Sequence, residues 1–155
     1  MTDARTPTTA FVLGGGGVLG AVEVGMLRAL LERDIRPDLV LGTSVGALNG
    51  AMVARDPSLT VIDRLIELWH SAGETGDVYG DRPLAAVRRA MSSRTHIYSA
   101  DPLKDRLRAE LDDITFEELP VTFQVCAASI ERAAEHWFTS GPVVDAVIAS
   151  AAVPG

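Results

Sequence analysis

The stretch Leu39-Val40-Leu41-Gly42-Thr43-Ser44-Val45-Gly46-Ala47-Leu48 decides the fold of this chain. The apolar run from Asp38 to Leu41 is short, which predicts a buried strand, and the small residues 45–54 predict a helix. The chain therefore passes from strand to helix within a few residues. Such a transition is typical of an α/β fold built on parallel strands.

The turn between this strand and helix fits the pattern Gly-x-Ser-x-Gly. We expect Gly42 and Gly46 to be glycines because a sharp turn brings backbone close to them, so that a Cβ would collide. Ser44 would then be exposed at the carboxyl end of the strand, above the N-terminal dipole of the following helix. The pattern predicts a serine nucleophile, although so short a pattern also arises by chance in a chain with 14 glycines.

A glycine-rich loop lies one predicted helix upstream. Residues 9–13 predict a strand, residues 14–20 a tight loop with four consecutive glycines, and residues 21–33 a helix with apolar residues at helical spacing. Bare backbone N–H groups at the N terminus of a helix form a nest for an anion. The anion could be a nucleotide phosphate or the oxyanion of a tetrahedral intermediate.

Nucleotide binding is the first alternative for this loop, because residues 15–20 satisfy Gly-x-Gly-x-x-Gly. That fingerprint needs an acidic residue at the end of the second strand. Asp34 and Asp38 precede the strand and would lie at its wrong end. A P-loop is disfavoured because no Lys-Ser/Thr pair follows Gly20. A flexible loop without a ligand remains a further interpretation.

Together, the glycine loop and the serine turn favour acyl-transfer chemistry. Both lie at carboxyl ends of predicted parallel strands, where open α/β sheets bind their ligands. Adjacent strands would bring the glycine amides near the Ser44 hydroxyl.

These residues resemble the patatin-like phospholipases, a family of acyl hydrolases, in order and spacing. The resemblance rests on residues 14–20, on Gly42-Thr43-Ser44-Val45-Gly46-Ala47, and on the tail from Ala146 to Gly155. It implies an α/β, three-layer, patatin-like fold with a mainly parallel sheet flanked by helices. It also implies that Ser44 is the nucleophile, that the amides of Gly15, Gly16 and Gly17 form the oxyanion hole, and that a lipid ester is the substrate. No metal or cofactor is implied.

Two departures from the family pattern stand out. The glycine loop has Leu19 where the family often has Arg or Lys, which removes a positive charge but none of the amide donors. The family's catalytic aspartate lies in an Asp-Gly pair downstream of the tail, and no Asp-Gly pair occurs in these 155 residues. We therefore expect one carboxyl-terminally truncated domain over residues 1–155 that lacks its dyad acid and has little activity. A noncatalytic remnant that binds lipid or a partner is the alternative.

A histidine could in principle replace the missing aspartate in a triad of the α/β-hydrolase type. We expect His70 to be an exposed helix residue, and His96 lies in a polar stretch without an evident partner. His136 follows a predicted hairpin turn. None of the three has a sequence feature that links it to Ser44.

Composition limits the remaining function classes. The net charge is −7 without a basic block, which disfavours nucleic-acid binding. The single cysteine, Cys126, is expected to be a small core residue. The sequence shows neither a signal peptide nor a long apolar run, so we expect a cytoplasmic protein that makes at most transient contact with a membrane surface. Oligomeric state is not indicated.

The rest of the chain predicts further elements. We expect helices over residues 60–71, from Asp101 to Leu111, and over residues 142–152, and strands over residues 121–130 and 135–138. Thr115 to Glu118 resembles a capping box. Residues 77–98 are either part of the core or a lid that faces lipid.

Overall fold

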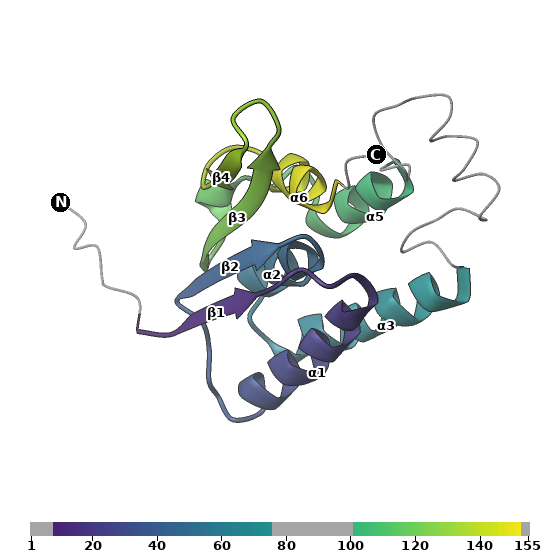
Figure 1. The fold of residues 1–155 in the computed structure, drawn as a ribbon. Coiled ribbons are helices and arrows are strands. Elements are labelled where there is room, and N and C mark those ends of the chain that lie inside the picture. Colours follow the sequence, from purple (N-terminus) through teal and green to yellow (C-terminus); the bar gives the residue numbers. More distant parts are fainter. Residues whose placement is uncertain (1–7, 76–100, 153–155) are drawn as a thin grey trace.

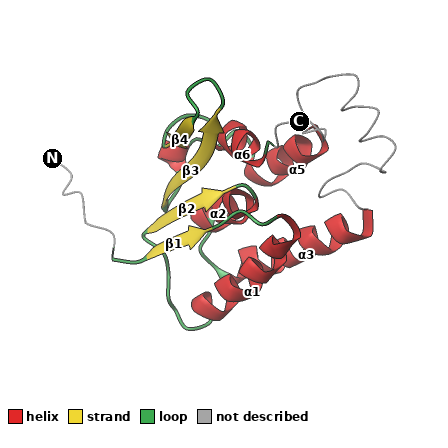
Figure 2. Ribbon diagram, viewed as in Figure 1, coloured by secondary structure: helices red, strands yellow, loops and turns green. Residues whose placement is uncertain are grey.

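The structure is a computed structural model of the 155-residue chain, and it describes residues 8–75 and 101–152. Figure 1 shows the order of the elements and Figure 2 their type. The elements are β1 (Ala10–Leu13), η1 (Gly17–Leu19), α1 (Gly20–Leu31), β2 (Leu39–Thr43), α2 (Val45–Arg55), α3 (Leu59–Thr75), α5 (Asp101–Leu111), η2 (Phe116–Glu118), β3 (Thr122–Ser129), β4 (Ala134–Phe138) and α6 (Val143–Ala151).

The four strands form one sheet in the order β1-β2-β3-β4. β1, β2 and β3 run parallel, and β4 returns antiparallel to β3 as a hairpin. The register places Leu13 beside Gly42, so the carboxyl ends of β1 and β2 meet at one end of the sheet. Thr43 pairs with Cys126, and β3 continues beyond this pair to Ser129. The predicted α/β class with a mainly parallel sheet flanked by helices is confirmed.

The described helices gather on one face of this sheet. α2 and α6 pack against the strands and against each other, and α1, α3 and α5 pack around α2 and α6. A right-handed crossover places its helix on a fixed side, so a strand order that advances in one direction puts every crossover helix on the same face. The second helical layer of the predicted three-layer arrangement is not among the described residues.

The buried core follows the covered face. It contains Phe11 of β1, Val40 of β2, and Phe123 and Val125 of β3, together with apolar residues from all the longer helices. The opposite face carries Val12, which is 74% exposed. Among the described residues no helix packs on this second face, although a parallel sheet is normally covered on both. We call it the open face of the sheet.

Cys126 corrects one prediction from the sequence. It is half-buried on the open face of β3, between the buried residues Val125 and Ala127, and so it is not a core residue. The predicted apolar run was correct as a strand, but successive side chains of a strand point to opposite faces. Only the fold determines which of the two faces is covered.

The predicted elements agree with the structure within a few residues at most ends. The predicted capping box forms at η2, where the Glu118 carboxylate accepts hydrogen bonds from the Thr115 N–H at 2.8 Å and from its hydroxyl at 2.9 Å. These two hydrogen bonds lower the pKa of Glu118 below its ordinary value, and the bond from the Thr115 N–H has the larger effect. The resulting stabilisation is present above the ordinary glutamate pKa and is lost as pH falls through the lowered one.

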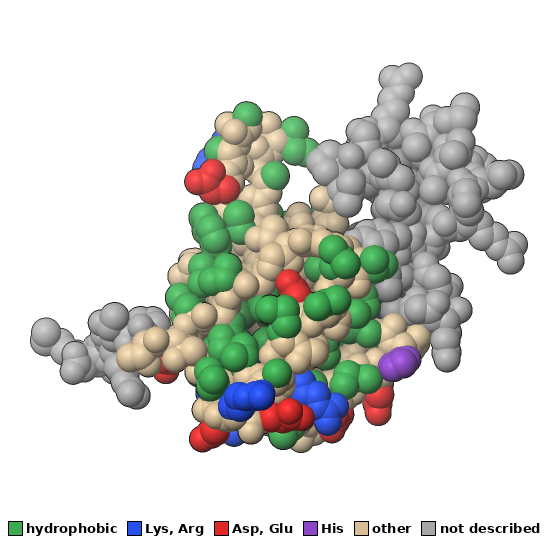
Figure 3. Space-filling model, turned by 60° about the horizontal axis from the view of Figure 1, so that its bottom comes forward, with side chains coloured by type: hydrophobic (Ala, Val, Ile, Leu, Met, Phe, Trp, Pro, Cys, Tyr) green, Lys and Arg blue, Asp and Glu red, His purple; other side chains and the backbone are tan. Residues whose placement is uncertain are grey.

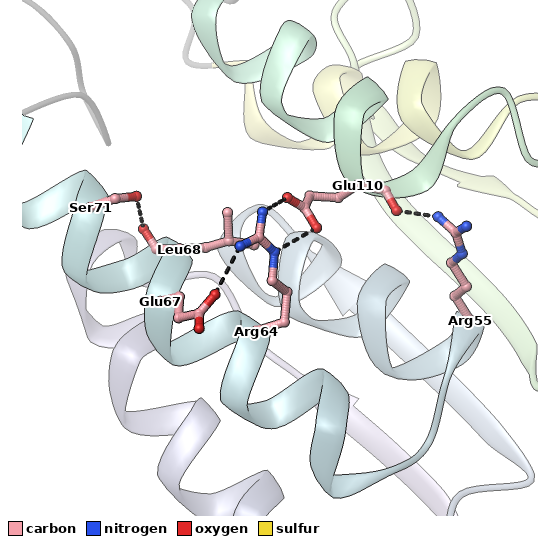
Figure 4. A network of polar contacts seen from close by, with 6 residues as sticks. All are labelled: Arg55, Arg64, Glu67, Leu68, Ser71 and Glu110. Carbon is pink, nitrogen blue, oxygen red and sulfur yellow. Dashed lines mark hydrogen bonds and ion pairs between the residues drawn. The ribbon is translucent and has the colours of Figure 1, made fainter.

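A polar network joins α3 to α5 on the surface (Figure 4). The Arg64 guanidinium binds Glu110 through two nitrogen atoms and also binds Glu67 at 2.9 Å. These carboxylates raise the pKa of Arg64 further above its ordinary value, with the hydrogen bond to Glu110 as the largest cause. Arg55 donates to the backbone carbonyl of Glu110. The network links α5 to α3 and to α2, the helix that follows Ser44.

Candidate active site

Ser44 occupies a strained turn at the carboxyl end of β2. Its backbone has φ 54° and ψ −121°, a left-handed conformation that residues other than glycine rarely adopt. α2 begins at the next residue, and the Ser44 carbonyl accepts the first hydrogen bonds of that helix, from the amides of Ala47 and Leu48. Ser44 itself is half-buried. We call this sharp strand-to-helix turn, residues 42–46, the elbow.

The two glycines of the elbow are required by close packing. A Cβ at Gly46 would lie 2.2 Å from the carbonyl oxygen of Leu13, and one at Gly42 would lie 2.6 Å from the Cα of Ala47. Both contacts are to backbone, which cannot move aside as a side chain can. The predicted collision at each flanking position is therefore present, and α2 rests directly on the end of β1.

The glycine loop lies beside the elbow. A Cβ at Gly15 would lie 3.4 Å from the Cβ of Ser44 and 3.8 Å from the carbonyl oxygen of Thr43. Within the described chain, the amides of Gly15 and Gly16 donate no hydrogen bond to other residues. Gly17 has a left-handed φ of 58° and begins the turn η1, whose first N–H has no partner within the turn. The structure thus brings the predicted loop and the predicted serine together.

Asn49 of α2 bonds the last residue of the glycine loop. The sequence did not predict a role for it. It is 1% exposed, and its amide nitrogen donates to the carbonyl of Gly20 at 2.9 Å and to the carboxylate of Glu23 at 3.0 Å. The indole N–H of Trp69 on α3 donates to its side-chain oxygen at 3.1 Å. The sequence did contain a signal for this role, because Asn49 is a polar residue in a helix of small apolar residues. A buried side-chain amide needs hydrogen-bond partners.

Ser150 of α6 lies against the elbow. The sequence indicated only that it belongs to the tail from Ala146 to Gly155. The Ser44 N–H donates to the Ser150 hydroxyl oxygen at 2.7 Å, and that hydroxyl donates to the carbonyl of Cys126 at 2.6 Å. Ser44 and Ser150 are 106 residues apart in sequence. Neither composition nor spacing could predict this contact.

No base for Ser44 is found among the residues that the structure describes. Its hydroxyl makes no hydrogen bond within residues 8–75 and 101–152. His70 on α3 and His136 on β4 are both exposed, as expected for His70, and neither is bonded to Ser44. His96 lies outside the described residues, as does the proposed lid over residues 77–98.

Two other features bear on ligand binding. A shallow hollow of about 460 Å³ lies between the β3–β4 hairpin and α6, and its lining includes Arg132, His136 and Phe138 but neither Ser44 nor the glycine loop.

Within the described ranges, no group of three or more His, Cys, Asp or Glu side chains could hold a metal ion. None of the helices in those ranges is long and apolar enough to cross a membrane.

Asp38 lies where the sequence placed it, at the start of β2. Its carboxylate accepts hydrogen bonds from the backbone N–H groups of Thr8 and Thr9 and from the Thr8 hydroxyl, at 2.8 to 3.1 Å. It is therefore at the opposite end of β2 from the glycine loop. A dinucleotide site would require an acid at the other end.

An exposed apolar stripe begins in the glycine loop and continues on α1. It consists of Val18, Leu19, Val22 and Met26, each 61% to 66% exposed. The sequence predicted a helix from apolar spacing that included Val22 and Met26, but the buried side of α1 is formed by Val24, Leu27 and Leu31. The reason is that α1 packs mainly against α2 and α3, and those neighbours decide which side is covered. Figure 3, which brings the lower side of the molecule forward, shows hydrophobic side chains gathered at its centre.

Comparisons with known proteins agree on one family. A family model described as "Patatin-like phospholipase" matches residues 11–155. An uncharacterized NTE family protein of Mycobacterium tuberculosis is 29% identical over 98% of this chain and 39% of its own length. The lysophospholipase nte1 of Aspergillus terreus is 51% identical over 49 residues, which are 32% of this chain and 3% of that protein.

The fold has a counterpart among solved structures. The chain matches a chain in the crystal structure of full-length SpcU in complex with full-length ExoU from Pseudomonas aeruginosa, with a TM-score of 0.61 and 20% identity. The match covers 97% of this chain and 39% of that one. The chain thus spans about two fifths of the length of this structure and of the mycobacterial relative.

Proposed function

Because the chain belongs to the patatin-like phospholipase family, we propose that it carries the nucleophile and the oxyanion-binding loop of a lipid acyl ester hydrolase. Ser44 attacks the acyl carbonyl, the amides of Gly15, Gly16 and Gly17 bind the oxyanion, and water then releases the acyl-enzyme. The observation that carries the proposal is the adjacency of the loop to Ser44, since a Cβ added at Gly15 would lie 3.4 Å from the Cβ of Ser44. The chemistry requires no metal or cofactor.

The strained backbone of Ser44 also supports this role. A non-glycine residue is held in a left-handed conformation only where the surrounding structure enforces it, and such positions cluster at functional sites. Here two glycines make the enforcing contacts possible. The amides of Gly15 and Gly16 have no acceptor among the described residues, so in this proposal they are available to stabilise developing negative charge beside Ser44.

We expect the 155-residue chain to have little activity by itself, because the described residues place no base beside Ser44. A serine hydroxyl is a weak nucleophile without an adjacent base, and the 155 residues contain no Asp-Gly pair. The proposal is therefore that this chain needs the family's aspartate to turn over substrate. A noncatalytic remnant that binds lipid or a partner is the competing function, since the Ser44 hydroxyl has no hydrogen bond in the described ranges.

An alkyl fluorophosphonate probe separates these functions. We define the extended version as this chain followed by a segment that carries the Asp-Gly pair of the family. The probe is expected to label Ser44 in the extended version about 10²-fold faster or more than in the 155-residue chain, because general-base assistance contributes at least that much. Peptide mass spectrometry identifies the labelled residue.

Each other outcome of this labelling has a definite meaning. Equal, rapid labelling of both versions would contradict the need for the aspartate and would point to a base within the chain. Labelling of neither version, while both are folded, would support the noncatalytic remnant. A thermal shift with NAD or ATP, which the proposal does not expect, would favour a nucleotide site in the glycine loop.

The apolar stripe is proposed to contact the surface of a lipid aggregate. Val18 and Leu19 belong to the glycine loop, and Val22 and Met26 lie in the first two turns of α1. We therefore expect a lipid that reaches Ser44 to lie near them. An exposed apolar patch of this kind commonly marks an interaction site. Contact with the membrane surface would be transient, because the buried apolar area of four side chains is small.

Single charges placed on this stripe test the contact. We expect Val22→Glu and Met26→Glu each to reduce cosedimentation with phosphatidylcholine vesicles several-fold, because a carboxylate is costly to bury in the interface. Ile130→Glu is the matched control, since Ile130 is 74% exposed on the β3–β4 turn. Equal losses in all three variants would contradict a specific role for the stripe.

A further inference from the structure

We propose that Ser150 is a positioning residue, which fixes the backbone of Ser44 in the elbow and couples it to α6. The inference rests on the proposed function of Ser44 as a nucleophile. The carrying observation is the chain of two short hydrogen bonds from the Ser44 N–H through the Ser150 hydroxyl to the Cys126 carbonyl, at 2.7 Å and 2.6 Å.

The hydroxyl of Ser150 replaces a direct contact between two strands. Thr43 and Cys126 are the last residues paired between β2 and β3. At the next residue, Ser44, the chain turns out of the strand and the pairing with β3 ends. The Ser44 N–H and the Cys126 carbonyl both bond the Ser150 side chain. The hydroxyl of Ser150 lies between these two groups and satisfies both, and a buried backbone group without a partner would be unfavourable.

The direction of the two bonds assigns the hydroxyl proton. A serine hydroxyl has one donor and two acceptor sites. Its proton goes to the Cys126 carbonyl, which can only accept, and its oxygen accepts the Ser44 N–H, which can only donate. Ser150 therefore acts on Ser44 through the backbone and leaves the Ser44 hydroxyl free for substrate.

Two consequences for the site follow from this bridge. The Ser44 N–H is occupied and is not an oxyanion donor, so the donors must come from elsewhere, as the glycine loop can provide. The bridge also ties the left-handed backbone of Ser44 to α6, which packs on β3 and α2. A shift of α6 would therefore change the direction in which Ser44 points.

The first arm of the test does not depend on enzyme activity. In the 155-residue chain, Ser150→Ala is expected to speed amide hydrogen exchange at Ser44 at least tenfold, because the Ser44 N–H loses its acceptor. Ser150→Thr keeps a hydroxyl and is expected to restore slow exchange. Unchanged exchange at Ser44 in a folded Ser150→Ala variant would overturn the proposal.

The second arm measures ester hydrolysis by the extended version. Ser150→Ala is expected to lower kcat about 10-fold to 100-fold with KM nearly unchanged, because the nucleophile is misplaced while the binding surface remains. Ser150→Thr is expected to recover most of kcat. The matched control is Ser129→Ala, a serine near the end of β3 that contacts Glu131 and not the elbow.

The outcomes of the two arms are distinguishable from failure of the proposed function. Hydrolysis that survives Ser44→Ala would refute the nucleophile, whatever Ser150 does. Faster exchange with an unchanged kcat in Ser150→Ala would refute the positioning role while leaving Ser44 as the nucleophile. An equal loss of kcat in Ser150→Ala and Ser150→Thr, with both folded, would also count against a role for the hydroxyl.

Discussion

Replacing Ser44 by alanine in the extended version is expected to lower hydrolysis of p-nitrophenyl butyrate by about 10⁴-fold or more, because a serine hydrolase without its nucleophile retains only the rate that binding and the oxyanion hole provide. Alanine removes one oxygen atom and leaves the fold almost untouched. The Ser44 hydroxyl makes no hydrogen bond in the described part of the chain, so its loss leaves no partner unsatisfied there.

The measurement needs a stability control and a second serine. The thermal midpoint of Ser44→Ala should equal that of the parent, since alanine keeps the Cβ and the backbone N–H that bonds Ser150. Ser58→Ala, which removes a hydroxyl bonded to Asp56 before α3, should keep the parent rate. If a folded Ser44→Ala variant hydrolysed the ester at the rate of the parent, the proposed mechanism would be wrong.

Replacing Gly46 by alanine is expected to destabilise the fold by about 3 kcal/mol, at the upper end of the cost of overpacking. The added Cβ would lie 2.2 Å and 2.4 Å from the carbonyl oxygen and carbon of Leu13, and 2.6 Å from the carbonyl oxygen of Gly14. All three neighbours are backbone atoms, so α2 must move away from β1. Because Gly14 begins the glycine loop, the same displacement should separate that loop from Ser44.

Gly25 supplies the matched control within another helix. A Cβ at Gly25 in α1 would have no neighbour within 4 Å, and we expect Gly25→Ala to stabilise the chain by about 0.5 to 1 kcal/mol through backbone entropy. Urea unfolding of the two variants measures the difference. If Gly46→Ala unfolded at the urea concentration of the parent, the close contact between α2 and β1 would be wrong.

The exposed apolar surfaces belong to two different places. The stripe runs from the glycine loop onto α1, whereas Val12 lies on the open face of the sheet. Their causes differ. The stripe is exposed because α1 buries its other side against α2 and α3, and the sheet face is open because the strand order puts the described helices on one side.

Much of the fold followed from local patterns in the sequence. Apolar runs and glycine-rich turns predicted β1, α1, β2 and α2 to within about two residues at nearly every end, and the hairpin of β3 and β4 followed from the polar turn between two apolar runs. These signals are local, because a strand, a cap or a sharp turn depends on residues near it in the chain. For the same reason the glycine loop and the Ser44 turn could be chosen as a pair.

By itself, the sequence determined the type and order of the elements and the need for Gly42 and Gly46, because a tight turn excludes a Cβ whatever surrounds it. The tertiary structure alone decided which side of α1 and which face of β3 are covered, so that Met26 and Cys126 are more exposed than a pattern suggests. It alone brought Ser150 to the Ser44 amide across 106 residues. Such contacts depend on how distant elements pack, and no local periodicity encodes that.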